Sequence, residues 1–485
     1  MTVPPRTISR NLRWQIIGRT DFDLRRLRLD ATSYCYSGSE HFVDIARVAT
    51  SSLADLAHVR QPTVFGKRQM IGSPSHGLPL FSSSEMLMQQ PEPAYFLSRR
   101  FQGHLTNTLA VSADTILITR TGSIGFVILV PRELNGALVD DNIIRVIAKH
   151  PTDTGFLYSF LRSPIGQDLI QRLSYGAVQN VFHGSQLAEL PVPQVSESIR
   201  EHVNDLIALC SSRRTEANSL NTAAIQRAVE INSLPDAHAL SRREIVGERK
   251  ALVFPIEQRR IVWDDTGTTE LRLDAHFHNP AARSTIEAIQ KCPSERRTVG
   301  ELALHVIMGG RFKRNYVESE FGTPFLSGKN IVQTRPTDLK YLSSTQTEGL
   351  DDMLIKKGWI LVTCSGTIGR TCFVWHNFED YAASQHILRI IPNEHEVDAG
   401  YLYAFLSSAF GYEQIVRFRY GSVIDEITDE QLKKVIVPLA EPRKQKEVGD
   451  AVRLAFEKRA EALKLEDEAQ QIIMREINRK AAKET

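Results

Sequence analysis

The chain has 485 residues, 42% of them hydrophobic and 24% charged, and a formal net charge of +2. This length predicts two to four domains, and the composition is typical of a globular protein. No segment approaches the roughly 20 consecutive apolar residues of a membrane span, residues 1–17 contain no apolar signal core, and the five cysteines form no C-x-x-C pair. We therefore expect a cytoplasmic protein without a zinc site or disulfide framework, in which any nucleic-acid binding rests on local positive charge.

A short glycine-containing motif occurs twice in the chain. Residues 119–126 have the sequence TRTGSIGF, and residues 363–370 have the sequence TCSGTIGR. An apolar run precedes and follows each copy, which predicts two short strands joined by a tight loop. Glycine at this place permits a positive φ and lets a partner approach the backbone closely.

The neighbourhood of the motif is repeated as well, in the same order and at nearly constant spacing. The matching segments are 27–31 and 271–275, 65–68 and 312–314, 77–80 and 322–325, 156–161 and 401–406, 175–176 and 420–421, and Pro193 and Pro438. This colinearity indicates a tandem duplication of one domain of mixed α/β type. The alternative is a chance similarity between two unrelated α/β domains.

A long helix is predicted after each copy. Residues 196–232 contain neither proline nor glycine and carry apolar residues at a spacing close to that of a coiled-coil seam. A second such stretch begins at Pro442, a residue typical of the first helical position. Because a long polar helix needs a partner, we expect the two to pack as an antiparallel rod with a pseudo-twofold axis. The alternative is that each helix packs only on its own domain.

The expected fold class is therefore α+β, with two tandem domains and two long helices. The predicted boundaries are 1–194 for the first domain, 195–250 for the first helix and a linker, 251–439 for the second domain and 440–485 for the second helix.

Several segments of the second copy form an ordered set of motifs. They are FLSGKNI at 325–331, YLS at 341–343, WILV at 359–362, SGTIG at 365–369, Gln385, the predicted helix 401–407, YGS at 420–422 and VPL at 437–439. With this set the chain resembles the specificity subunits of Type I restriction–modification enzymes over nearly its whole length. The first copy departs from the pattern, since FSSSE at 81–85 stands where the second copy has LSGKN.

The resemblance implies two target recognition domains, each of which reads one half of a split, asymmetric site in double-stranded DNA. It also implies long helices that set the spacing and dock two methyltransferase subunits, which a restriction endonuclease/translocase subunit can join. S-adenosylmethionine, Mg and ATP are then expected only on the partner subunits.

Candidate DNA-binding residues gather in basic loops and around the glycine motifs of both copies. Arg and Lys contact phosphates and pair with guanine, Asn and Gln pair with adenine, and Ser/Thr–Gly loops offer backbone N–H groups to phosphate oxygens. Solvated surface charge is the alternative for each residue. The candidates are Lys67, Arg68, Arg120, Ser123, Tyr175, Arg311, Lys313, Arg314, Lys329, Asn330, Ser365, Thr367, Arg370, Gln385, Arg419, Tyr420 and Ser422.

No motif of an enzyme is found, so we expect no catalytic residue and no metal site. Neither glycine loop is followed by the Lys-Ser or Lys-Thr of a phosphate-binding loop, and there is no H-E-x-x-H. The pairs Asp140-Asp141 and Asp351-Asp352 are better explained as turn caps than as magnesium ligands. Three other functions stay open: a DNA reader in a phage-defence system that methylates without restricting, a nuclease or methylase in its own right, and a purely protein-binding scaffold.

Overall fold

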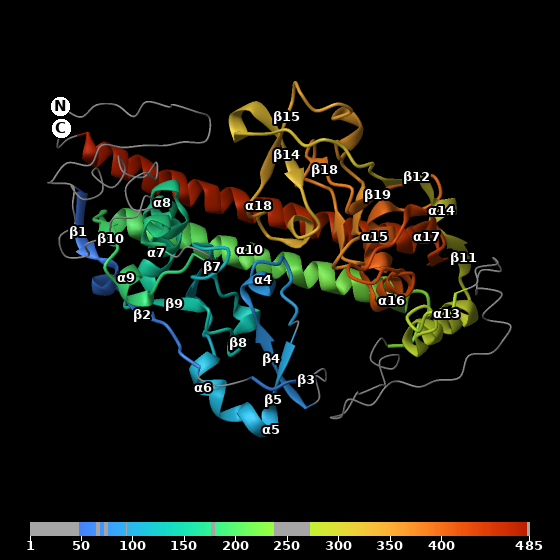
Figure 1. Ribbon diagram of the computed structural model, residues 1–485, viewed down its shortest axis with the longest axis horizontal. Coiled ribbons are helices and arrows are strands. Elements are labelled where there is room, and N and C mark those ends of the chain that lie inside the picture. The colour runs from blue at the N-terminus through green and yellow to red at the C-terminus, as the bar shows by residue number, and fades with distance from the viewer. Residues whose placement is uncertain are drawn as a thin grey trace. The chain divides into compact units, whose positions relative to one another are not determined.

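The computed structural model describes residues 48–64, 68–71, 76–93, 95–175, 180–236 and 272–482 (Figure 1). These residues form two compact units. Unit 1 contains the described residues up to Met86, those of Pro91–Thr215 and those from Glu461 onward, and unit 2 contains Leu87–Gln90 and the described residues of Glu216–Ala460. Two long helices, α10 (Glu197–Glu230) and α18 (Pro442–Ala481), each contribute to both units.

Unit 1 is built on two small sheets of four strands. The first is antiparallel, in the order β2 (Ala57–Arg60), β9 (Ile143–Ala148), β6 (Ile116–Thr119) and β7 (Val127–Leu129). The second has the order β3 (Met70–Ile71), β5 (Tyr95–Ser98), β4 (Gly77–Phe81) and β8 (Leu138–Val139), with β4 and β8 parallel. A separate pair joins β1 (Ala49–Ser52) to β10 (Pro191–Pro193).

The helices of unit 1 pack on both sheets and on the long helices. The longer ones are α7 (Thr154–Arg162) and α8 (Pro164–Leu173), and the short ones are α3 (Leu53–Leu56), α4 (Ser83–Met86), α5 (Arg99–Gln102), α6 (Thr106–Leu109) and α9 (Gly184–Ala188). Their core includes Phe156 and Phe160 of α7, which lie in one buried cluster with Val203 of α10 and Ile473 of α18. The long helices are therefore part of the hydrophobic core of the unit.

Unit 2 repeats this arrangement strand for strand. Its first sheet has the order β12 (Ala303–Met308), β19 (Ile387–Pro392), β16 (Ile360–Thr363) and β17 (Thr371–Phe373). Its second has the order β13 (Tyr316–Val317), β15 (Lys340–Ser343), β14 (Gly322–Leu326) and β18 (Ala382–Ala383), again with a parallel last pair. The pair β11 (Glu295–Thr298) and β20 (Ile436–Leu439) corresponds to β1 and β10.

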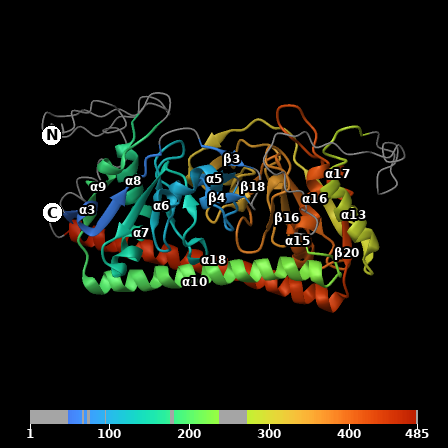
Figure 2. The same ribbon diagram turned by 90° about the horizontal axis from the view of Figure 1, so that it is seen from below.

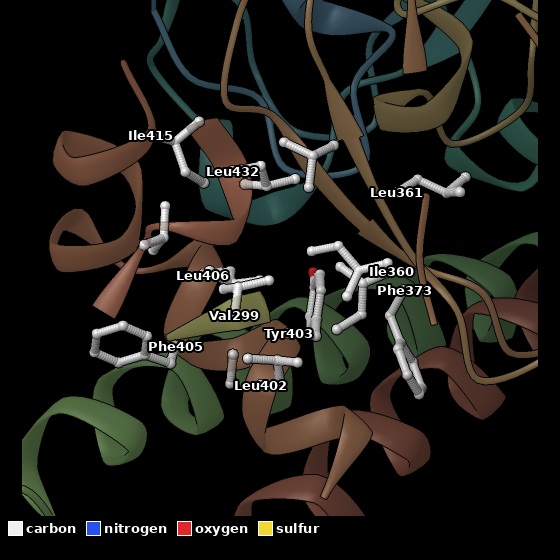
Figure 3. Packing of buried hydrophobic residues seen from close by; sticks show 14 of the residues in the cluster. Val299, Ile360, Leu361, Phe373, Leu402, Tyr403, Phe405, Leu406, Ile415 and Leu432 are labelled. Atoms are coloured by element: carbon white, nitrogen blue, oxygen red, sulfur yellow. The ribbon is translucent and has the colours of Figure 1, made fainter. Parts of the chain in front are cut away.

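The helices of unit 2 are α13 (Pro280–Lys291), α14 (Val299–Leu302), α15 (Ala399–Ser407), α16 (Ala409–Arg417) and α17 (Asp429–Lys433). Figure 3 shows how α15 fills the core: Leu402, Tyr403 and Leu406 lie among Ile360 of β16 and Phe373 of β17. The same order of strands and the same helix pair in both units confirm the predicted fold class of two domains of mixed type with two long helices. The predicted domain boundaries stay a prediction.

Both glycine motifs form the tight loop expected from the sequence. Gly122 and Gly125 have φ of 70° and 86°, and Gly366 and Gly369 have φ of 72° and 85°. The loops join β6 to β7 and β16 to β17. Residues that carry a Cβ rarely adopt a positive φ, which explains glycine at these positions.

Within unit 1 the sections of α10 and α18 run antiparallel, side by side (Figure 2). Arg214 of α10 pairs with Glu466 of α18 at 2.8 Å, whereas Lys480, further along α18, donates to the carbonyl of Gln194, just before α10. Glu466 is fully buried in this helix pair. Its carboxylate also accepts a hydrogen bond of 2.5 Å from the Tyr158 hydroxyl and lies 3.3 Å from Arg162. The helix pair of unit 1 therefore encloses a buried polar cluster.

Candidate nucleic-acid interface

The basic loop of unit 2, residues 309–315, connects β12 to β13 and presents three cations. Arg311, Lys313 and Arg314 are all exposed. Arg314 donates from Nη2 to Oε1 of Gln385 at 2.7 Å, and its Cζ lies 5.5 Å from the centre of the Phe325 ring. Arg311 and Lys313 are thus surface charges, whereas Arg314 is held in one orientation.

Gln385 lies in the turn between β18 and β19, and contacts from Cys364, directly after β16, hold this turn in place. The N–H of Cys364 donates to the carbonyl of His386 at 3.0 Å, and its thiol lies 3.5 Å from the carbonyl of Gln385. The Gln385 side chain also contacts its neighbour, with Nε2 at 3.0 Å from Nε2 of His386. A Cβ at Gly309 would lie in ordinary contact, 3.5 Å, with the Cα of Gln385. The loop and the turn are therefore neighbours in unit 2.

Two further candidates follow β14 and differ in their surroundings. Lys329 is exposed and pairs with Asp338 at 3.0 Å. Asn330 is buried: its Oδ1 accepts from the backbone N–H and the hydroxyl of Ser327, and its Nδ2 donates to the carbonyl of Thr337 at 2.9 Å. The Asn330 amide is therefore used in holding this loop, and its role in DNA binding stays a prediction.

The glycine loop of unit 2 lies against the hairpin 420–426. Ser365 and Tyr420 both form backbone bridges with Glu426, and the Ser365 hydroxyl lies 3.5 Å from the Glu426 carboxylate. Thr367 and Ser422 are exposed. Arg370 is half-buried next to the loop, where its backbone N–H donates to the hydroxyl of Thr363 at 3.0 Å.

A pocket of about 420 Å³ opens between this loop and α16. Its lining includes Thr367, Arg417 and Arg419 but also Glu413 and Asp425. Arg419 lies 3.6 Å from Asp425, and burial raises the pKa of the Glu413 carboxyl, which Arg419 opposes. Since charges of both signs line the pocket, it does not have the character of an anion site.

In unit 1 the candidate arginines are partly buried, whereas the other described candidates are exposed. Arg68 forms ion pairs with Asp140, at 2.7 Å, and with Asp141, and its side chain is 20% exposed. Arg120 is half-buried, and its backbone N–H donates to the carbonyl of Asn142 at 3.4 Å. Ser123 and Tyr175 are exposed. Lys67 lies outside the described residues. Two further cations of unit 1, Arg99 and Arg100, are exposed on α5.

Two buried arginines were not foreseen from the sequence. Arg145 of β9 donates to the carbonyls of Ile143 at 2.6 Å and Val139 at 2.7 Å, and Arg389 of β19 donates to that of Asp352 at 2.7 Å. Burial lowers the pKa of Arg145 to about 10, which leaves it charged at neutral pH, and burial also lowers the pKa of Arg389. The two arginines occupy equivalent places in the two units, and each ties its strand of the first sheet to a segment outside that sheet, β8 for Arg145 and the residues before β16 for Arg389. The signal available in the sequence was their place in the repeat, a charge inside an apolar strand in both copies.

Among the described residues, no group of three or more His, Cys, Asp or Glu side chains is arranged to hold a metal. Burial raises the pKa of the Cys364 and Cys372 thiols to about 12, so neither supplies a thiolate at neutral pH. No helix in the described part of the chain is long and apolar enough to cross a membrane.

Residues 293–458 match the family model of the Type I restriction modification DNA specificity domain. This part of the chain is a DNA specificity domain of that family. The resemblance drawn from the sequence is thereby confirmed for this part of the chain, and the family is one of DNA-recognition subunits rather than of catalytic ones. Among curated proteins no match was found.

Solved structures of such subunits are similar to the chain at low identity. One is the "Type-I restriction-modification system S subunit from M. genitalium", at 15% identity and a TM-score of 0.34, covering 89% of this chain and 95% of that one. Another is the "HsdS subunit from Thermoanaerobacter tengcongensis", at 14% identity and a TM-score of 0.28, covering 87% and 94%.

Proposed function

We propose that the chain reads a bipartite, asymmetric site in double-stranded DNA, with one half-site for each unit. This proposal rests on one observation: the two units share a fold, but the side chains at an equivalent turn differ. Both units hold an arginine against the turn before β9 or its counterpart β19, but the turn residue is Gln385 in unit 2 and Asp141 in unit 1. Since the fold is constant and the contacting side chains differ, the two units are suited to different base sequences.

The long helices supply the second part of the proposal, a docking surface for two methyltransferase subunits. Helix α18 carries exposed charge along its length, including Arg443 and Lys446, while its apolar side is used within the units. A restriction endonuclease/translocase subunit can join this assembly, and S-adenosylmethionine, Mg and ATP then bind to the partners. Assembly in the cytoplasm, and a system that methylates without restricting, are both compatible with the same reader.

The test compares the purified chain alone with the chain plus its methyltransferase subunits. Alone, with duplex DNA, S-adenosylmethionine and Mg, we expect binding but neither methyl transfer nor cleavage, because the sequence contains no cofactor or metal motif of an enzyme. With the partners we expect methylation and co-elution on size exclusion. Turnover by the chain alone that a single point mutation abolishes would instead identify an enzyme, and failure to co-elute would remove the scaffold role.

A further inference from the structure

Arg314 and Arg68 occupy the same position of the repeated fold. Both belong to the matching segments 312–314 and 65–68 that precede the second sheet. Their partners match too, since Asp141 lies two residues before β9 and Gln385 two residues before β19. Each unit therefore carries an arginine clamped to the same turn.

The two clamps differ in charge. In unit 2 the partner is the neutral amide of Gln385, so the pair keeps the full positive charge of Arg314. In unit 1 two carboxylates, Asp140 and Asp141, bind the two terminal nitrogens of Arg68, and the cluster has a formal charge of −1. Asp140 and Asp141 also accept the backbone N–H groups of Asn142, at 2.8 Å, and Val64, at 3.3 Å, which closes the cluster on itself.

The support beneath the arginine also differs. The fourth residue of β14 is Phe325, whose ring lies under the Arg314 guanidinium, and the fourth residue of β4 is Leu80. Phe325 is itself fixed by edge-on contact with Phe312 at 5.9 Å between ring centres. A guanidinium that lies over a ring and is held at one nitrogen has fewer orientations open to it, so its remaining N–H groups lose less conformational entropy on binding.

We propose that Arg314, oriented by Gln385 and Phe325, reads a guanine in the half-site of unit 2, and that its counterpart Arg68 is a structural lock that reads no base. This inference rests on the proposed function and adds the chemistry of one contact. A planar, charged guanidinium matches the O6 and N7 acceptors of guanine in the major groove. Adenine is not the expected base, because the Gln385 oxygen that would accept from adenine N6 is already bound to Arg314.

The experiment selects bound sequences from a library of randomised duplexes with the full chain, alone and with its methyltransferase subunits. Arg314→Lys keeps the charge but loses the two-pronged contact, so we expect one guanine to lose its preference over the other bases, by roughly tenfold to a hundredfold. The other half-site and the salt dependence of binding stay as in the wild type. Gln385→Asp, which copies unit 1, is expected to weaken the same guanine preference.

Arg68→Lys is the matched control and should leave every base preference unchanged. The inference is overturned if Arg314→Lys and Gln385→Asp both keep all preferences while folded by circular dichroism, or if Arg68→Lys loses one. A wild-type chain that selects no sequence at all would contradict the proposed function itself, so the two failures are told apart.

Discussion

Glu466→Gln is expected to lower the free energy of unfolding by about 3 kcal/mol. Removing one member of a buried ion cluster leaves uncompensated charge, which costs about 3–5 kcal/mol. The lower end applies because the side chains of Arg162 and Arg214 are still 19% and 22% exposed, whereas that of Glu466 has no exposure. Burial opposes the charge of Arg214, yet the Glu466 carboxylate outweighs it and holds the Arg214 pKa well above its usual value. Urea unfolding followed by circular dichroism measures the change.

Two variants sharpen this test. Glu461→Gln removes a carboxylate of the same helix that pairs with Arg213 at 3.1 Å, with side chains 33% and 47% exposed, and should cost less than about 1 kcal/mol. Replacing the whole cluster by apolar residues, with Tyr158→Phe, Arg162→Met, Arg214→Met and Glu466→Met together, should recover most of the stability. Equal losses for Glu466→Gln and Glu461→Gln would mean that the cluster is not buried as described.

Removing the two free cations of the basic loop, with Arg311→Ala and Lys313→Ala, is expected to weaken DNA binding roughly fifty-fold at about 0.1 M salt. Both side chains are exposed on a loop whose third cation is held in place, so they are suited to contact phosphates. Each phosphate contact adds about 0.9 to the slope of log K against log salt, so the slope should fall by about 1.8. Fluorescence anisotropy of a labelled duplex over a salt series measures both quantities.

The matched control removes the same net charge from helix α18. Arg443 and Lys444 have exposed side chains, 90% and 45%, that pair only with Glu447 and Glu441 of the same segment in the described ion pairs. Arg443→Ala with Lys444→Ala should leave the slope unchanged. If both double variants reduce the slope alike, the effect is one of net charge, and the loop 309–315 is not the interface.

The architecture could be predicted because repetition and periodicity are properties of the sequence itself. The repeated motifs predicted two similar domains. The apolar spacing of the two long stretches predicted a helix seam, and Val203, Ala217, Ala455 and Ala462 of these stretches are buried. Glu466 was not foreseen there. Spacing alone treats a glutamate as a surface residue, and its partners Tyr158 and Arg162 come from a helix more than 300 positions away in the chain.

The interface could be predicted only in part, because residue type does not determine burial or pairing. Arg68 and Arg314 look alike in the sequence, but the carboxylates that bind Arg68 come from a turn far along the chain. Asn330 belongs to a motif of the family and looks like a base reader, yet its amide is used inside its own loop. Arg311, Lys313 and Thr367 are exposed and stay candidates. Whether a candidate is exposed, buried or paired depends on which strands the fold brings together.

The central claim is that each unit reads its own half of one DNA site. Selection of bound sequences from fully randomised duplexes, by the wild-type chain in complex with its methyltransferase subunits, tests it directly. The account predicts two short, different motifs separated by a spacer of constant length in which every base is tolerated. A single motif, two identical motifs or no enrichment would contradict it.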